Sequence, residues 1–185
     1  MRKLFLFISF VALTISFSSC LNVSEPQFSP SIHGSYFYVN PVFRGDSLIS
    51  AQDSITELFY DADDGTYDLD TVYVGDTVMF AARFYTYTSD LVSVKLDWEK
   101  NHLDLWYFLN DSIKSALTET SDTTAGKLAF DLGYNSVAFP IYFTPLLKGG
   151  TTIKLTVTST SEYSTSSVKF YIPAQVHAAD SIATN

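Results

Sequence analysis

Apolar and polar residues alternate along most of the chain between positions 34 and 173. Val78, Phe80, Ala82 and Phe84 fall on one side of an extended backbone, and the residues between them fall on the other. The same two-residue period recurs in several further segments, at 36–39, 55–60, 92–98, 103–107, 128–132, 137–143, 153–157 and 168–172. This period is typical of β-strands with one buried face.

Turn-forming residues separate these segments, as at Asp63-Asp64-Gly65 and Gly149-Gly150. Residues 111–120 are predicted to form a short helix or a turn. Pro140 lies inside a predicted strand, and proline cannot donate a ladder hydrogen bond, so that strand is expected at a sheet edge or a bulge. Eight or nine short strands predict an all-β antiparallel β-sandwich, with an up-and-down β-barrel as the alternative.

The first twenty residues have the pattern of an export signal. Arg2 and Lys3 precede an uncharged apolar run at 4–17, and Cys20 closes the segment. The run is about 14 residues long, shorter than the ~20 that a membrane-spanning helix needs. Residues 1–19 resemble a bacterial lipoprotein signal, which implies that Cys20 becomes the first mature residue and carries the lipid. An ordinary signal peptide with an incidental cysteine is the alternative.

The charge of the chain excludes one class of partner, and its cysteine content excludes internal disulfides. The chain has 11 basic and 20 acidic side chains, and removal of residues 1–19 leaves 9 basic ones and a net charge of −11. A nucleic-acid binder needs a basic face, so we expect no nucleic-acid partner. Cys20 is the only cysteine, so no intramolecular disulfide can form. The predicted organisation is a lipid-anchored tether at 20–33, a sandwich domain at 34–173 and a tail at 174–185.

Four segments resemble strands B, C, F and G of an immunoglobulin-like domain: TVYVGDTVMF from Thr71, LVSVKLDW from Leu91, FTPLLKGGTTIKLTV from Phe143 and SSVKFYI from Ser166. Trp98 stands at the place of the buried strand-C tryptophan. With the export signal, the whole chain resembles small envelope lipoproteins of Bacteroidetes. The resemblance implies an outer-membrane lipoprotein, facing the periplasm or the surface, that acts as a non-catalytic binding or assembly module.

Sequence motifs for catalysis are missing. A blue-copper site needs two imidazoles and a thiolate, but the mature chain has only Cys20, which the lipid would occupy, and its histidines are far apart in sequence. Zinc-binding histidine pairs, a nucleophile elbow and a phosphate loop are also absent from the sequence. Asp97 and Glu99 share one strand face with Lys95, where we expect a solvated surface. We therefore predict that the protein is not an enzyme and has no cofactor.

Two groups of residues are candidates for binding a ligand. Asp61, Asp63 and Asp64 surround a glycine turn and could supply oxygen ligands to a weakly bound calcium ion, or serve only as a hairpin loop. Tyr85, Tyr87 and Trp106 lie on strand faces opposite core residues. Such rings could stack on the sugars of a glycan, or pack beneath other chain segments.

A short triplet recurs along the chain, with Asp followed by Ser or Thr and then an apolar residue or Thr. Examples place Ser47, Ser54 and Ser112 at the central position. The triplet is similar to the O-glycosylation signal of exported Bacteroidetes proteins, which implies modification at these serines. The triplet also fits a turn followed by a new strand, because Asp favours turns and β-branched residues favour strands.

Overall fold

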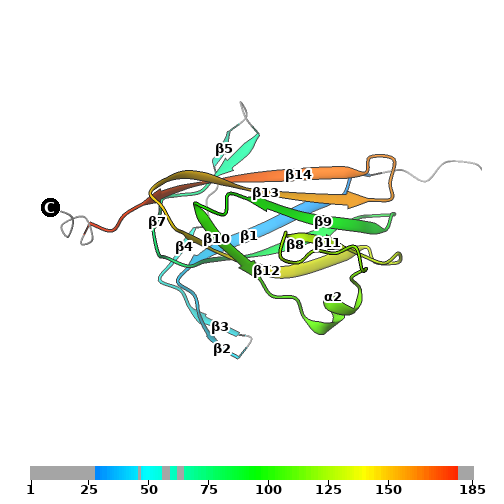
Figure 1. The fold of residues 1–185 in the computed structure, drawn as a ribbon, viewed down its shortest axis with the longest axis horizontal. Coiled ribbons are helices and arrows are strands. Elements are labelled where there is room, and N and C mark those ends of the chain that lie inside the picture. The colour runs from blue at the N-terminus through cyan, green and yellow to red at the C-terminus, as the bar shows by residue number, and fades with distance from the viewer. Residues whose placement is uncertain (1–27, 46, 56–58, 62–64, 179–185) are drawn as a thin grey trace, which may run out of the picture.

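The structure is a computed structural model that describes residues 28–45, 47–55, 59–61 and 65–178. Strands make up most of these residues, with one short helix, α2 (Asp111–Ser115), and the all-β prediction is confirmed (Figure 1). No helix within the described ranges is long and apolar enough to cross a bilayer.

Two sheets pack face to face. The first is antiparallel throughout, in the order β10 (Leu103–Tyr107), β12 (Ser136–Pro145), β8 (Val78–Tyr85), β1 (Ser31–Val39) and β4 (Asp53–Ile55). The second has the order β11 (Lys127–Ala129), β9 (Leu91–Trp98), β13 (Gly149–Ser159), β14 (Thr165–Gln175), β6 (Thr66–Asp68) and β5 (Phe59–Asp61). The short β7 (Val72–Tyr73) and β6 run parallel to β14.

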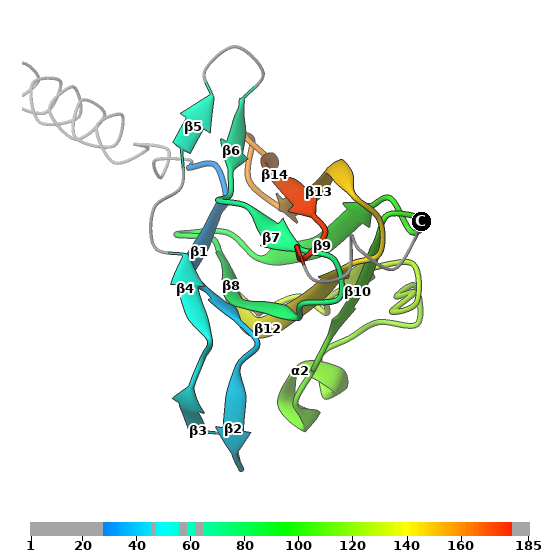
Figure 2. The same cartoon turned by 90° about the vertical axis from the view of Figure 1, so that its left-hand side faces the viewer.

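A separate hairpin of β2 (Val42–Arg44) and β3 (Ser47–Ser50) extends from the first sheet, on the same side of the molecule as α2 (Figure 2). Its strands belong to neither sheet of the sandwich. The hairpin connects β1 to β4, which returns alongside the end of β1.

The strand order is that of an immunoglobulin-like sandwich. Strands β1, β8, β12 and β10 correspond to A, B, E and D, and β9, β13 and β14 correspond to C, F and G. The alternative of an up-and-down barrel is wrong for the described strands, because they divide into two separate packed sheets.

Aromatic rings fill the centre of the sandwich. Phe37 stacks on Phe80 with ring centroids 4.6 Å apart, and Phe170 from the opposite sheet lies 5.7 Å from Phe80. All three side chains are at most 3% exposed. The predicted alternation of β8 and β12 produces this arrangement, since Phe80 and Phe143 both point inward. Burial of such rings is the main source of stability for the domain.

The predicted strand faces differ from the structure at three positions. Leu91 is fully buried in place of Val92, because a bulge at Val92, near the start of β9, shifts the register. Leu132 is 72% exposed, because the chain turns away after Phe130. Trp98 packs on the edge of the core but is only half-buried, with the Lys100 amine 5.3 Å from the centre of its ring.

The predicted boundaries also shift slightly. Strand β1 begins at Ser31, inside the expected tether, and β14 continues to Gln175, inside the expected tail. The segment predicted as one strand at 55–60 contains the end of β4 and the start of β5. Helix α2 is confirmed within the predicted range, with the Asn110 side chain accepting a hydrogen bond from the Ile113 amide at 2.9 Å.

Pro140 lies in β12, which is an inner strand of its sheet and not an edge strand. Locally, however, it is at an edge, because β10 pairs with β12 only as far as Ile141. The nitrogen of Pro140 points to the β10 side, where the Phe108 amide donates to the Pro140 carbonyl, so the missing N–H removes no hydrogen bond to β8.

Candidate functional site

The outer surface of the first sheet carries a group of large side chains, which we call the aromatic face: Tyr38, Met79, Trp106, Phe108 and Tyr142. Trp106 and Tyr142 are directly opposed on β10 and β12, and their rings stack with centroids 5.7 Å apart. Phe108 meets the Tyr142 ring edge-on at 5.5 Å. Met79 lies between Tyr38 and Tyr142 in the strand ladder and is only 7% exposed, although it points away from the core.

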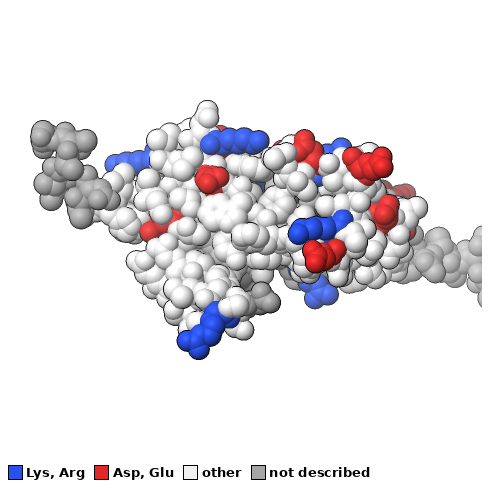
Figure 3. Space-filling model, turned by 60° about the horizontal axis from the view of Figure 1, so that its bottom comes forward, with Lys and Arg blue, Asp and Glu red and all other residues white. Residues whose placement is uncertain are grey.

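The β2–β3 hairpin stands beside this face and encloses a groove of about 900 Å³. Phe43 and Leu48 of the hairpin line it together with four residues of the aromatic face, and Ile113 of α2 contributes to its lining. A neighbouring hollow of about 430 Å³ adds Trp106 to the same lining. Figure 3 shows few charged residues over this side of the molecule. The groove is therefore an open, largely uncharged surface with several rings.

One asparagine fixes the base of the hairpin. Asn40 has φ 47°, a left-handed conformation that asparagine adopts more readily than most residues. Its amide nitrogen donates to Gln52 at 2.7 Å and to Asp76 at 3.0 Å, and its side-chain oxygen accepts from the Thr77 amide at 2.9 Å. These bonds tie both ends of the hairpin to the start of β8.

Partial burial raises the pKa of one tyrosine that lines the groove. Desolvation raises the pKa of Tyr142, because the ionised phenolate would lose contact with water between its neighbours. The Tyr142 side chain is thus partly shielded from water by its neighbours.

The three predicted glycan contacts do not meet at one site. Trp106 belongs to the aromatic face, whereas Tyr85 lies at the other end of β8, six residues from Met79 or about 20 Å along the strand. The Tyr85 hydroxyl bonds to His33 at 2.9 Å and to Tyr87 at 3.2 Å. The bond to Tyr85 raises the pKa of Tyr87.

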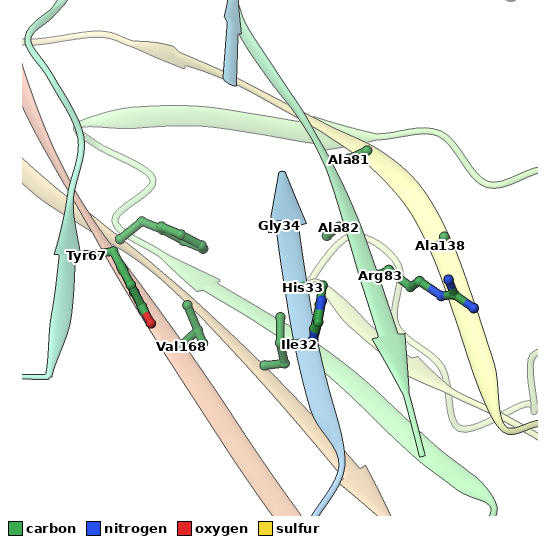
Figure 4. Close-up of a pocket in the computed structure, with 10 residues that line it drawn as sticks. Ile32, His33, Gly34, Tyr67, Ala81, Ala82, Arg83, Ala138 and Val168 are labelled. Atoms are coloured by element: carbon green, nitrogen blue, oxygen red, sulfur yellow. The ribbon is translucent and has the colours of Figure 1, made fainter. Parts of the chain in front are cut away.

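A shallow hollow of about 460 Å³ adjoins this tyrosine pair (Figure 4). Its lining includes small residues of β1, β8 and β12, namely Gly34, Ala81 and Ala138. Arg83 and His33 stand on one side of β1, and Tyr67 and Val168 stand on the other (Figure 4).

The serines predicted for glycosylation are accessible. Ser47, Ser54 and Ser112 lie on β3, β4 and α2, and all three are exposed. The Asp53 carboxylate accepts a hydrogen bond from the Ser54 amide at 2.7 Å, so this aspartate caps the local backbone. Modification of these serines remains a prediction.

Other predicted sites fall wholly or partly outside the described residues. These include the signal at 1–19, Cys20, Asp63 and Asp64, and only the backbone of Asp61 is described. Within the described ranges, no three His, Cys, Asp or Glu side chains gather closely enough to hold a metal ion. Calcium binding therefore remains a prediction.

The solvated strand face expected around Asp97 is confirmed. The Lys95 amine lies 2.6 Å from the Asp97 carboxylate, and both side chains are about half exposed. Glu99 contacts the His102 ring at 3.1 Å, also at the surface.

The sequence did not single out Tyr38, Phe43 or Tyr142 as site residues. Tyr142 alternates with the buried Ile141 and Phe143, so its outward position could have been found from the strand pattern. The contribution of Phe43 could not, because it depends on where the hairpin folds relative to the sheet.

Comparison with known proteins identifies no family. No family model matches the chain, and no curated protein matches its sequence. A family 123 glycoside hydrolase from Clostridium perfringens is similar over 79% of this chain and 28% of its own, with 14% identity and a TM-score of 0.35.

Two other solved structures are comparably distant. The secreted serine protease VesC from Vibrio cholerae is similar over 58% of this chain and 21% of its own, with 14% identity and a TM-score of 0.28. AggA, the major subunit of aggregative adherence fimbriae type I from Escherichia coli, is similar over 82% of this chain and all of its own, with 12% identity and a TM-score of 0.33. The chain thus spans under a third of the hydrolase and of the protease.

Proposed function

We propose that this protein is a non-catalytic binding or assembly module of the cell envelope, anchored by lipid on Cys20, and that it holds a protein partner in the hairpin groove. The observation that supports binding is the aromatic face with its adjoining hairpin. Phe108 is 61% exposed and Phe43 is 38% exposed, and both lie on the same groove. Contiguous exposed apolar surface of this kind marks interaction sites in soluble domains.

The residue types in the groove favour a protein partner. Trp, Tyr, Phe and Met are enriched at the centres of protein interfaces, and four of these types occur in the aromatic face. The hairpin adds Phe43 and Leu48 to the lining of the same groove. A partner that covered the groove would remove these side chains from water.

A photo-crosslinking experiment tests the proposed face. A photoreactive phenylalanine analogue replaces Phe108, and in a matched protein it replaces Tyr163, which is 59% exposed but lies in the turn between β13 and β14. Irradiation of native envelopes should give one discrete protein adduct from position 108 and none from position 163. Equal crosslinking from both positions, or none from either, contradicts a binding role for the aromatic face.

The anchor has its own test. Replacing Cys20 with Ala should move the protein from the membrane fraction to the soluble fraction, because the acidic domain gains little attraction to anionic lipid. Retention of the variant on membranes after a high-salt wash would show that the lipid is not the anchor.

Glycan capture is the second candidate function. The hollow beside Tyr85 supports it, because Arg83 and His33 offer hydrogen bonds to hydroxyl groups next to an aromatic ring. Tyr85→Ala, Tyr87→Ala and Trp106→Ala are compared in gels that contain a panel of polysaccharides. Retardation of the wild type that the Tyr85 and Tyr87 variants lose would favour this function, and unchanged migration of every protein on every glycan would refute it.

A further inference from the structure

Strand β12 is longer than its neighbour β10. The two strands pair from Leu103 with Pro145 to Tyr107 with Ile141, and the chain then leaves β10 for helix α2. Residues 136–139 of β12 continue beyond this point and pair only with β8. A stretch of sheet edge is left beside the first half of β12, which we call the open lane.

The backbone groups in the open lane can be assigned by alternation. The Pro140 carbonyl accepts a hydrogen bond from the Phe108 amide at 3.4 Å, so position 140 faces the β10 side. In an antiparallel strand the N–H and C=O of one residue point the same way, and every second residue repeats that direction. Ala138 and Ser136 therefore direct their N–H and C=O groups into the open lane.

These backbone groups have no partner within the described part of the chain. The hydrogen bonds between β12 and β8 are made by the alternate residues, such as Val137 and Phe139. Pro140, which lies opposite Ala81, has no N–H and cannot donate such a bond, which agrees with this assignment. No described residue bonds to Ser136 or Ala138 from the β10 side. Both residues are exposed.

The open lane has an apolar hollow at its side. A space of about 220 Å³ lies between α2 and β12, and its lining includes Ile113, Ala116, Phe130 and Val137. Ala138 lines this space and also the hairpin groove and the hollow beside Tyr85. Ala138 thus lies where these three depressions meet.

We infer that an extended segment of a partner protein adds to this sheet as a strand, pairing with Ser136 and Ala138 and placing an apolar side chain in the hollow beside α2. Donors and acceptors that repeat every two residues, about 7 Å apart, match another peptide backbone. This inference rests on the proposed function and names the form in which the partner binds.

The test uses the mature chain with Cys20→Ala, labelled with ¹⁵N, and a panel of acetylated, amidated octapeptides in which Thr alternates with Val, Ile, Leu or Phe. Binding of a panel member should shift the amide resonances of Ser136 and Ala138 and slow their hydrogen exchange at least tenfold. N-methylation of the peptide at alternate positions should abolish binding in one register and preserve it in the other. This outcome is expected only if main-chain hydrogen bonds hold the peptide.

Ala138→Pro removes one N–H from the open lane and none from the β8 ladder, as Pro140 already does two residues later. It should therefore fold and lose peptide binding, whereas Ala138→Ser should retain it. The inference is overturned if no panel member binds at 1 mM, if Ala138→Pro folds and still binds, or if both N-methylated registers bind. Because the crosslinking at position 108 is measured separately, failure of the aromatic face and failure of the open lane are distinguishable.

Discussion

The two outer faces of the sandwich are built on similar interiors but differ in chemistry. On the second sheet, the outward positions of β11, β9, β13 and β14 carry Lys127, Lys95, Lys154 and Lys169, with threonines between them. On the first sheet, the corresponding positions carry the aromatic face. Each sheet needs only its inward residues to form the core, so the outward residues are free to differ between the two sides of the sandwich.

The two faces also differ in how far their outward side chains are exposed to solvent. Outward side chains of the polar face remain in water, and the ion pair between Lys95 and Asp97 on β9 is about half exposed. On the aromatic face, Met79 lies between Tyr38 and Tyr142 in the ladder and is buried almost as completely as the core. An outward strand position is thus not always an exposed one.

The largest effect that separates the two faces is expected at Met79. Met79→Ala should lower the free energy of unfolding by about 3 kcal/mol, because it empties a buried site outside the core. Thr156→Ala, at an outward position of β13, should cost less than about 1 kcal/mol. Denaturant midpoints measure both. Equal losses would mean that the two faces are covered alike.

A smaller loss is expected at the hairpin base. Asn40→Ala should cost about 2 kcal/mol, since it removes three side-chain hydrogen bonds and places a less tolerant residue at φ 47°. Amide exchange of the β2–β3 hairpin should accelerate more than that of β13. Asn40→Gly is the control, because it relieves the backbone strain without restoring the bonds. An unchanged hairpin in Asn40→Ala would show that other contacts hold it.

Strand β10 has one side-chain face on the aromatic face and one toward the core. Alkaline pH tests the contribution of Tyr107, which packs against the core. Tyr107 donates a hydrogen bond to the Thr123 carbonyl, and burial, with a smaller effect of Asp122, raises its pKa to about 12. The folded state favours the neutral phenol, so this contribution is complete below pH 10 and is lost as the pH rises from about 10 to 12. The denaturant midpoint should fall less over this range in Tyr107→Phe. A parallel fall in both proteins would contradict the assignment.

The smallest effect is expected on the polar face. Lys95→Ala breaks the ion pair with Asp97, but both groups are about half exposed, so the change should be below about 0.5 kcal/mol and should vanish in 1 M salt. A loss above 1 kcal/mol would show that this face is more than a solvated surface.

Much of the fold was predictable because strand alternation is a local signal. The inward residues of β8 and β12 follow from a period of two, and the sandwich follows from the number and spacing of such strands. The errors at Val92 and Leu132 arise where a bulge or a turn breaks the period, which the linear pattern does not mark. Trp106 was singled out by its outward position, whereas its stacking partner Tyr142 was not, since strand pairing decides which rings meet.

The sequence alone determined most of the residues that face the core and that the domain is all β, because burial of alternating apolar side chains is a property of each strand. Only the tertiary structure decided which outward residues form a surface together. The left-handed turn at Asn40 positions the hairpin beside the aromatic face, and the early end of β10 exposes the edge of β12. Both depend on contacts between segments far apart in sequence, so no local pattern of residues specifies them.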